Sequence, residues 1–82
     1  MTEKEWSNLF AARVRSRLDY IGMTRVELCE KIGVSKTTFD LWMNGKHIPK
    51  ATDIVNIAKA LGCSVGYLIY YGKLVEKEKG NE

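Results

Sequence analysis

The sequence predicts an all-α protein, a compact domain of five helices without a strand. Three observations support this fold class: apolar residues recur at steps of three and four, polar residues suited to capping precede these runs, and glycines end them. At 82 residues the chain is expected to form one core, because a chain of this size buries only about 60% of its unfolded surface. We assign residues 1–72 to this domain and residues 73–82 to a charged, flexible C-terminal tail.

The first helix is marked by a single apolar stripe that ends at Gly22. The stripe consists of Phe10, Val14, Leu18 and Ile21. Ser7 is a candidate cap and would place the helix at about residues 7–20. Thr2 is followed three residues later by Glu5, and this pair offers a competing, earlier start because it can form a capping box. The residues alone leave both starts open.

Two short helices separated by a tight turn are expected next. Thr24 is followed three residues later by a glutamate, the reciprocal capping arrangement of a helix start, which places the second helix at about residues 25–31. Gly33 supplies the turn. Ser35 then caps a third helix at about residues 36–43.

The last two helices follow a loop. The spacing of Ile54, Ile57, Ala58 and Leu61 predicts an amphipathic fourth helix at about residues 51–61. Gly62 ends it. Ser64 is expected to cap a short fifth helix that Gly72 stops.

Composition argues against several classes of protein. The N-terminal stretch MTEKEWSNLF lacks the apolar run of a signal peptide, and the apolar stretch YLIYY at 67–71 is too short to span a bilayer, so a cytoplasmic location is expected. Cys29 and Cys63 stand far apart without a CxxC pattern, and the chain has one histidine. We therefore expect buried thiols, with no disulfide, no metal site and no cofactor.

The charge of the chain is suited to a polyanionic partner without proving one. The net charge is +3, and residues 10–50 carry eight Lys and Arg against four Asp and Glu. Surplus lysine is also common on ordinary protein surfaces, so both explanations stay open. The single histidine, His47, lies in a predicted loop and has no nucleophile and orienting group at a familiar spacing. The sequence therefore predicts a binding protein and no enzyme.

The third helix has two different faces. At about 100° per residue, Phe39, Trp42 and Met43 fall on one side. The other side carries Lys36, Thr37, Asp40, Leu41 and Asn44. A solvated surface would explain the polar side of an isolated helix equally well. However, a helix, a tight glycine turn and a second helix form the helix-turn-helix, whose second helix lies in the DNA major groove.

The helix-turn-helix and the residues that follow it resemble a known protein family. Residues 23–62, MTRVELCEKIGVSKTTFDLWMNGKHIPKATDIVNIAKALG, closely resemble the Cro/C1-type helix-turn-helix family, the λ-repressor-like DNA-binding domains. The helix-turn-helix covers about residues 24–44, and the whole resemblance about 14–72. Its small residue falls on Cys29 and its turn glycine on Gly33. Its buried apolar positions fall on Leu28, Ile32, Val34, Phe39 and Trp42.

The resemblance implies a role for individual residues. The residues expected to contact bases are Ser35, Lys36, Thr37, Asp40 and Leu41. The residues expected to contact the sugar-phosphate backbone are Arg25, Thr38, Asn44 and Lys46, and Arg25 has the alternative of bracing the recognition helix. Of Arg13, Arg15 and Arg17, at most one or two are expected to meet the DNA backbone and the others to be solvated.

Two positions depart from the family pattern. Asp40 stands where a small polar residue is usual, and Leu41 stands where a basic residue is frequent. A carboxylate near phosphates weakens binding unless it accepts a hydrogen bond, for which a cytosine amino group is the obvious partner, and leucine can contact a thymine methyl. Alternatively, this face of the helix is turned toward a protein.

The function implied is that of a sequence-specific DNA-binding transcriptional regulator, a phage- or prophage-type repressor that binds double-stranded DNA. Such domains bind as two-fold dimers. The candidate dimer surface consists of Ile69, Tyr70, Tyr71, Leu74 and Val75, which exceed what one short helix can bury. The alternative is that Leu68 and Ile69 belong to the core and the tyrosines lie flat on the surface. Two alternatives use the same fold for protein contacts: an antitoxin-type protein and an adaptor that has lost DNA binding.

Overall fold

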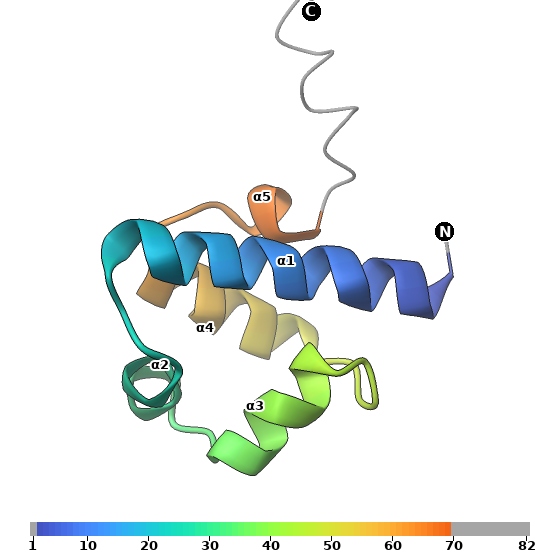
Figure 1. Cartoon of the computed structure of the whole chain (residues 1–82), viewed down its shortest axis with the longest axis horizontal. Coiled ribbons are helices and arrows are strands. Elements are labelled where there is room, and N and C mark those ends of the chain that lie inside the picture. The colour runs from blue at the N-terminus through green and yellow to red at the C-terminus, as the bar shows by residue number, and fades with distance from the viewer. Residues whose placement is uncertain (1, 70–82) are drawn as a thin grey trace, which may run out of the picture.

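Between residues 2 and 69, the part of the chain described by the computed structural model, there are five α-helices and no strand (Figure 1). They are α1 (Glu3–Ile21), α2 (Arg25–Ile32), α3 (Lys36–Met43), α4 (Ala51–Leu61) and α5 (Val65–Ile69). The all-α prediction is confirmed, and the predicted bounds of α3 and α4 are those observed. The predicted stop at Gly72 and the predicted tail lie outside the described residues. None of the five helices is long and apolar enough to cross a membrane.

The start of α1 is decided in favour of the earlier of its two candidate caps. Thr2 Oγ1 accepts a hydrogen bond from the Glu5 amide at 3.1 Å, and Glu5 Oε1 accepts one from the Thr2 amide at 2.8 Å. The backbone hydrogen bond from Thr2 lowers the pKa of Glu5 below its ordinary value, because it favours the ionised carboxylate. The prediction of Ser7 as the cap is wrong, since Ser7 lies inside the helix and is buried.

The other predicted caps are observed where the sequence placed them. Thr24 forms the reciprocal capping box at the start of α2 with distances of 2.8 and 3.1 Å. Ser35 Oγ accepts a hydrogen bond from the Thr38 amide at 3.1 Å at the start of α3. Ser64 Oγ accepts one from the Tyr67 amide at 3.0 Å at the start of α5. Local hydrogen bonding therefore fixes where these helices begin.

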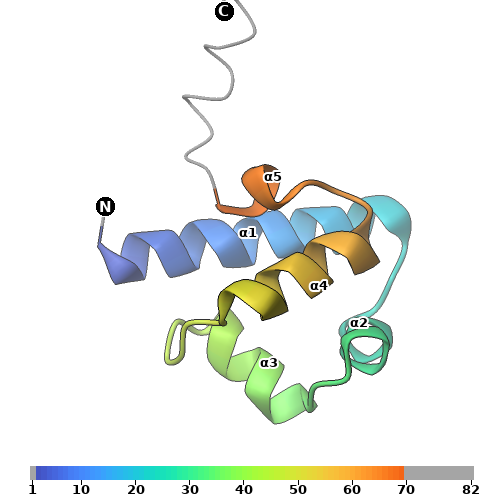
Figure 2. The same cartoon turned by 180° about the vertical axis from the view of Figure 1, so that it is seen from behind.

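The core lies between α1, α3, α4 and α5, with α2 closing one end. Figure 1 shows α1 between α5 and the pair of helices α2 and α3, and Figure 2 shows α4 on the other side of α1. The largest fully buried apolar side chains come from every helix. They are Phe10, Val14, Leu28, Phe39, Ile57, Leu61 and Leu68. An 8-residue helix such as α3 is unstable alone, so it depends on this packing for its shape and position.

Two arginines of α1 hold the C-terminal helices in place. Arg17 Nε donates to the Leu61 carbonyl at 2.9 Å and Arg17 Nη2 donates to the Gly62 carbonyl at 3.2 Å, which satisfies the free end of α4. Arg13 donates to the Tyr67 carbonyl, and its guanidinium lies over the Tyr67 ring at 4.9 Å. Arg13 and Arg17 are therefore bound to carbonyl groups of the domain and not simply solvated, whereas Arg15 is exposed as expected.

The loop after α3 packs closely on α1. Gly45 has φ of 77°, a left-handed conformation that side chains rarely adopt, and a Cβ added to it would lie 3.2 Å from Ser7 Cβ. Ser7 is 2% exposed, and its hydroxyl has no hydrogen-bond partner among the described residues. The small size of both residues therefore allows the end of α3 to approach α1.

We predict that Gly45→Ala lowers the free energy of unfolding by more than Gly33→Ala does. Gly33 has φ of 75° with nothing within 4 Å of an added Cβ. Its substitution should therefore lower the free energy of unfolding only by the cost of placing alanine in a left-handed conformation, about 1–2 kcal/mol. Gly45→Ala adds the crowding against Ser7. Urea unfolding of the two variants measures the difference, and equal losses would contradict the close contact.

Candidate nucleic-acid interface

Helix α3 presents one buried face and one accessible face. Phe39, Trp42 and Met43 are at most 8% exposed, and the two aromatic rings meet edge to face with centroids 6.3 Å apart. On the opposite side Lys36, Thr37 and Asn44 are exposed, while Asp40 and Leu41 are half-buried. The predicted division of this helix into two faces is confirmed, and the aromatic residues belong to the core.

The N-terminal turn of α3 is organised by hydroxyl groups. Ser35 Oγ caps the helix and also donates a hydrogen bond to Thr38 Oγ1 at 3.0 Å. The family resemblance implies separate roles for these two residues, Ser35 toward bases and Thr38 toward the DNA backbone. The structure brings them together at the start of the helix, where their hydroxyls are held in fixed positions.

Three charged residues gather beside this turn, and we call Arg25, Lys36 and Asp40 the Asp40 cluster. Arg25 Nη1 lies 3.4 Å from Asp40 Oδ1, and Lys36 Nζ lies 3.0 Å from Asp40 Oδ2. The Arg25 guanidinium also lies over the Phe39 ring, 5.8 Å from its centroid. The structure shows the bracing contact considered for Arg25, because this side chain connects the start of α2 to α3, and its contact with the DNA backbone stays a prediction.

Only one of the two contacts in the Asp40 cluster could be predicted from the sequence. Lys36 and Asp40 stand four residues apart on one helix, a spacing that brings their side chains together. The contact between Arg25 and Asp40 depends on the angle at which α2 meets α3, which no local pattern reports. The bracing role considered for Arg25 was predicted without its partner, and the pairing of Lys36 with Asp40 was not predicted.

The ion pairs of the Asp40 cluster are accessible to water. The side chains of Arg25, Asp40 and Lys36 are 39%, 34% and 58% exposed. An exposed pair of this kind contributes about 0.2–1 kcal/mol to stability. The cluster therefore fixes the positions of charges on the surface more than it stabilises the fold.

The end of α3 and its loop complete the accessible surface. The Lys46 amide donates to the Leu41 carbonyl at 2.9 Å, so the loop folds back on the last turn of the helix. Asn44 and Lys46 are both exposed there. The residues predicted for DNA contact thus lie along α3 and at both of its ends, with Arg25 reaching them from α2.

The cysteines take no part in this surface. Burial raises the pKa of the Cys29 thiol, and the charge of Asp40 adds to that effect. Burial also raises the pKa of the Cys63 thiol, with Arg17 opposing it. Both thiols are therefore neutral at pH 7 and suited to packing. Within residues 2–69 no three His, Cys, Asp or Glu side chains are placed to hold a metal ion.

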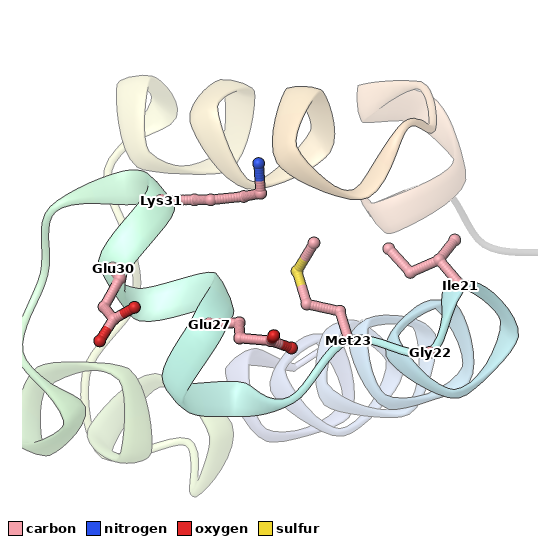
Figure 3. Close-up of a pocket in the computed structure, with 6 residues that line it drawn as sticks. All are labelled: Ile21, Gly22, Met23, Glu27, Glu30 and Lys31. Carbon is pink, nitrogen blue, oxygen red and sulfur yellow. The ribbon is translucent and has the colours of Figure 1, made fainter.

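An open groove of about 440 Å³ lies at the corner between α1 and α2. It is lined by Ile21, Gly22, Met23, Glu27, Glu30 and Lys31. Figure 3 shows Met23 and Ile21 from the corner between the helices, with Glu27 and Lys31 extending from α2 beside them. Its lining residues come from α1, α2 and their connection, so the groove is separate from the accessible face of α3.

These features define the class of protein, a λ-repressor-like helix-turn-helix domain in which the polar face of α3 is accessible. A sequence profile of the helix-turn-helix family matches residues 15–68, more than half of the chain. The chain therefore belongs to the Cro/C1-type helix-turn-helix family, and its fold is that of a DNA-binding transcriptional regulator.

Several solved structures are similar to the chain. A hypothetical transcription factor, NHTF from Neisseria, has a TM-score of 0.79 at 19% identity, over 95% of this chain and 90% of that one. The P22 c2 repressor, solved with a synthetic operator, has a TM-score of 0.68 at 27% identity, over 76% of this chain and 94% of that one. FeII HppE has a TM-score of 0.69 at 29% identity over 78% of this chain, which spans only 34% of HppE. No curated protein sequence matches the chain.

We predict that a double-mutant cycle on Arg25→Ala and Asp40→Ala gives a coupling of about 0.2–1 kcal/mol in the free energy of unfolding. The coupling reports the ion pair alone, because the stacking of Arg25 on Phe39 is lost in both variants that lack Arg25 and therefore cancels. The coupling should fall toward zero in roughly 1 M NaCl, where screening is strong. Arg25→Ala combined with Asp19→Ala is the control without a contact. A coupling that persists at high salt would contradict a water-accessible pair.

Proposed function

We propose that the protein is a sequence-specific regulator of the phage-repressor type that binds operator DNA by inserting α3 into the major groove. The observation that carries this proposal is the orientation of α3, whose aromatic side chains are buried while its polar side chains are accessible. A B-DNA major groove is wide enough to admit such a helix. The likeness to the P22 c2 repressor, a structure that contains a synthetic operator, supports the same mode of binding.

The proposed contacts divide into two groups. Ser35, Lys36, Thr37, Asp40 and Leu41 form the face that meets base edges. Arg25, Thr38, Asn44 and Lys46 flank that face and would set the position of the helix through phosphate and sugar contacts. Binding is the whole mechanism in this proposal, because occupation of a site on DNA changes the access of polymerase. Such a protein would act in the cytoplasm, where the DNA is.

A second candidate function is that of an adaptor or antitoxin-type protein that uses the same face for a protein partner. The observation that favours it is the compensated charge of α3, because Lys36 is paired with Asp40 and the neighbouring Leu41 is apolar. A salt titration separates the two candidates. DNA affinity should fall by about 0.9 log units per log unit of salt for each phosphate contact, and an adaptor would show no such slope.

We predict that Lys46→Ala and Thr37→Ala affect DNA binding in different ways. Loss of the Lys46 charge should weaken binding to all duplexes alike and reduce the salt slope by about 0.9. Loss of the Thr37 hydroxyl should change preference at particular base pairs by about 1–3 kcal/mol. Selection from random duplexes, followed by salt titration, measures both effects.

The control for this experiment is Lys59→Ala, which removes the same charge from an exposed position near the end of α4. This variant should retain the wild-type slope and preference. If Lys46→Ala behaves like Lys59→Ala and Thr37→Ala leaves the preference untouched, α3 is not the recognition helix.

We also propose that the protein binds DNA as a homodimer through Ile69 and the residues that follow it. Ile69 is half-buried against the core, whereas the other proposed contacts, Tyr70, Tyr71, Leu74 and Val75, lie outside the described residues. A two-fold dimer would place its recognition helices about 34 Å apart, one turn of B-DNA.

Sedimentation at micromolar concentrations is the test of this dimer. We expect a dimer on selected DNA, and Leu74→Glu should weaken it because a buried charge is unfavourable in an apolar interface. Lys73→Glu, a nearby position outside the proposed contacts, is the control. A wild-type protein that sediments as a monomer at every concentration, with and without DNA, would exclude the dimer.

A further inference from the structure

The accessible face of α3 contains a single acidic residue, and its charge is already engaged. Asp40 directs one carboxylate oxygen toward Arg25 and the other toward Lys36, at 3.4 and 3.0 Å. These two cations come from different helices, so the carboxylate lies where α2 and α3 approach each other. Both of its oxygens therefore have charged donors before any DNA arrives.

We propose that Asp40 is a positioning residue that sets the DNA specificity of the protein through Arg25 and Lys36, and that it does not itself read a base. It holds these two cations in place and withholds their charge from phosphates of non-matching DNA. This inference rests on the proposed function. Within the face that meets base edges, it gives Asp40 a positioning role in place of a direct contact with a base.

The geometry of the carboxylate favours positioning over direct base contact. A cytosine amino group is a neutral donor, and hydrogen bonds from charged donors are roughly twice as strong. To accept from cytosine, Asp40 would have to share an oxygen already facing a guanidinium or an ammonium group. The Arg25 guanidinium also lies over the Phe39 ring, so Arg25 is held beside Asp40 Oδ1.

The charge of the cluster explains how positioning becomes specificity. Without Asp40, Arg25 and Lys36 would offer two uncompensated cations to any phosphate backbone, and non-specific affinity arises from such contacts. With Asp40 in place, the ammonium group of Lys36 is held beside the carboxylate at a defined position on α3. From that position a matched site can offer it the adjacent O6 and N7 acceptors of guanine. Specificity is the ratio of the affinity for matched DNA to the affinity for non-specific DNA, so lowering the non-specific affinity raises the specificity.

The test compares Asp40→Asn with Asp19→Asn in the full-length protein. Asp19 is an exposed carboxylate near the end of α1 with no ion pair among the described residues, so both variants change the net charge equally. The probes are a duplex selected by the wild-type protein and a random-sequence duplex, each titrated with salt. Thermal unfolding of each variant confirms that the domain is folded.

For Asp40→Asn we expect affinity for the random duplex to rise by about threefold to tenfold near 0.1 M salt, with a salt slope steeper by about one to two. The ratio of selected to random affinity should fall, and preferences should weaken at several base pairs together. Asp19→Asn should match the wild type. Adding Lys36→Gln to Asp40→Asn should remove most of the gain, because the freed ammonium group is then absent.

Two results would overturn this inference while leaving the proposed function intact. In one, Asp40→Asn behaves like Asp19→Asn in slope and ratio. In the other, preference is lost at a single base pair while random-duplex affinity is unchanged, which would make Asp40 a direct base contact. If the wild-type protein binds neither duplex with a salt-dependent affinity, the proposed function fails and the inference fails with it.

Discussion

Phe39 and Trp42 are buried beneath α3 and set the orientation of this helix on the domain. With both rings beneath α3, the geometry of the helix leaves Thr37, Asp40 and Asn44 on the accessible side. Full burial of one large apolar side chain contributes about 1.5–3 kcal/mol, whereas an exposed ion pair contributes about 0.2–1 kcal/mol. Packing therefore decides which way α3 faces, and the surface charges adjust to that orientation.

A short helix needs more than a buried face to be held at a defined angle. The Ser35 cap and the Gly33 turn fix the start of α3, and the contact between Gly45 and Ser7 fixes its end against α1. Arg25 joins the two helices of the motif from the side. The helix is thus restrained at both ends and along its length, and a surface that is pre-organised in this way loses less conformational entropy when it binds a partner.

Local signals explain why most of the fold could be predicted from the sequence. Caps such as Thr24 and Ser35 and stops such as Gly33 act within four residues, so their chemistry is visible in the chain itself. Ser7 was misread because its burial depends on a loop far along the chain. The bond from Arg17 to the end of α4 and the pairing of Arg25 with Asp40 are also tertiary, so spacing alone could not place them.

The arginines also show why net charge is a weak guide to a DNA-binding surface. Of the cations counted between residues 10 and 50, Arg13 and Arg17 bind carbonyl groups of the domain itself, and Arg25 and Lys36 face one carboxylate. Fewer cationic side chains are therefore free to contact a polyanion than the count over the sequence suggests. Attraction through net charge acts on every polyanion alike, so any discrimination between partners has to come from the shape and chemistry of the contact surface.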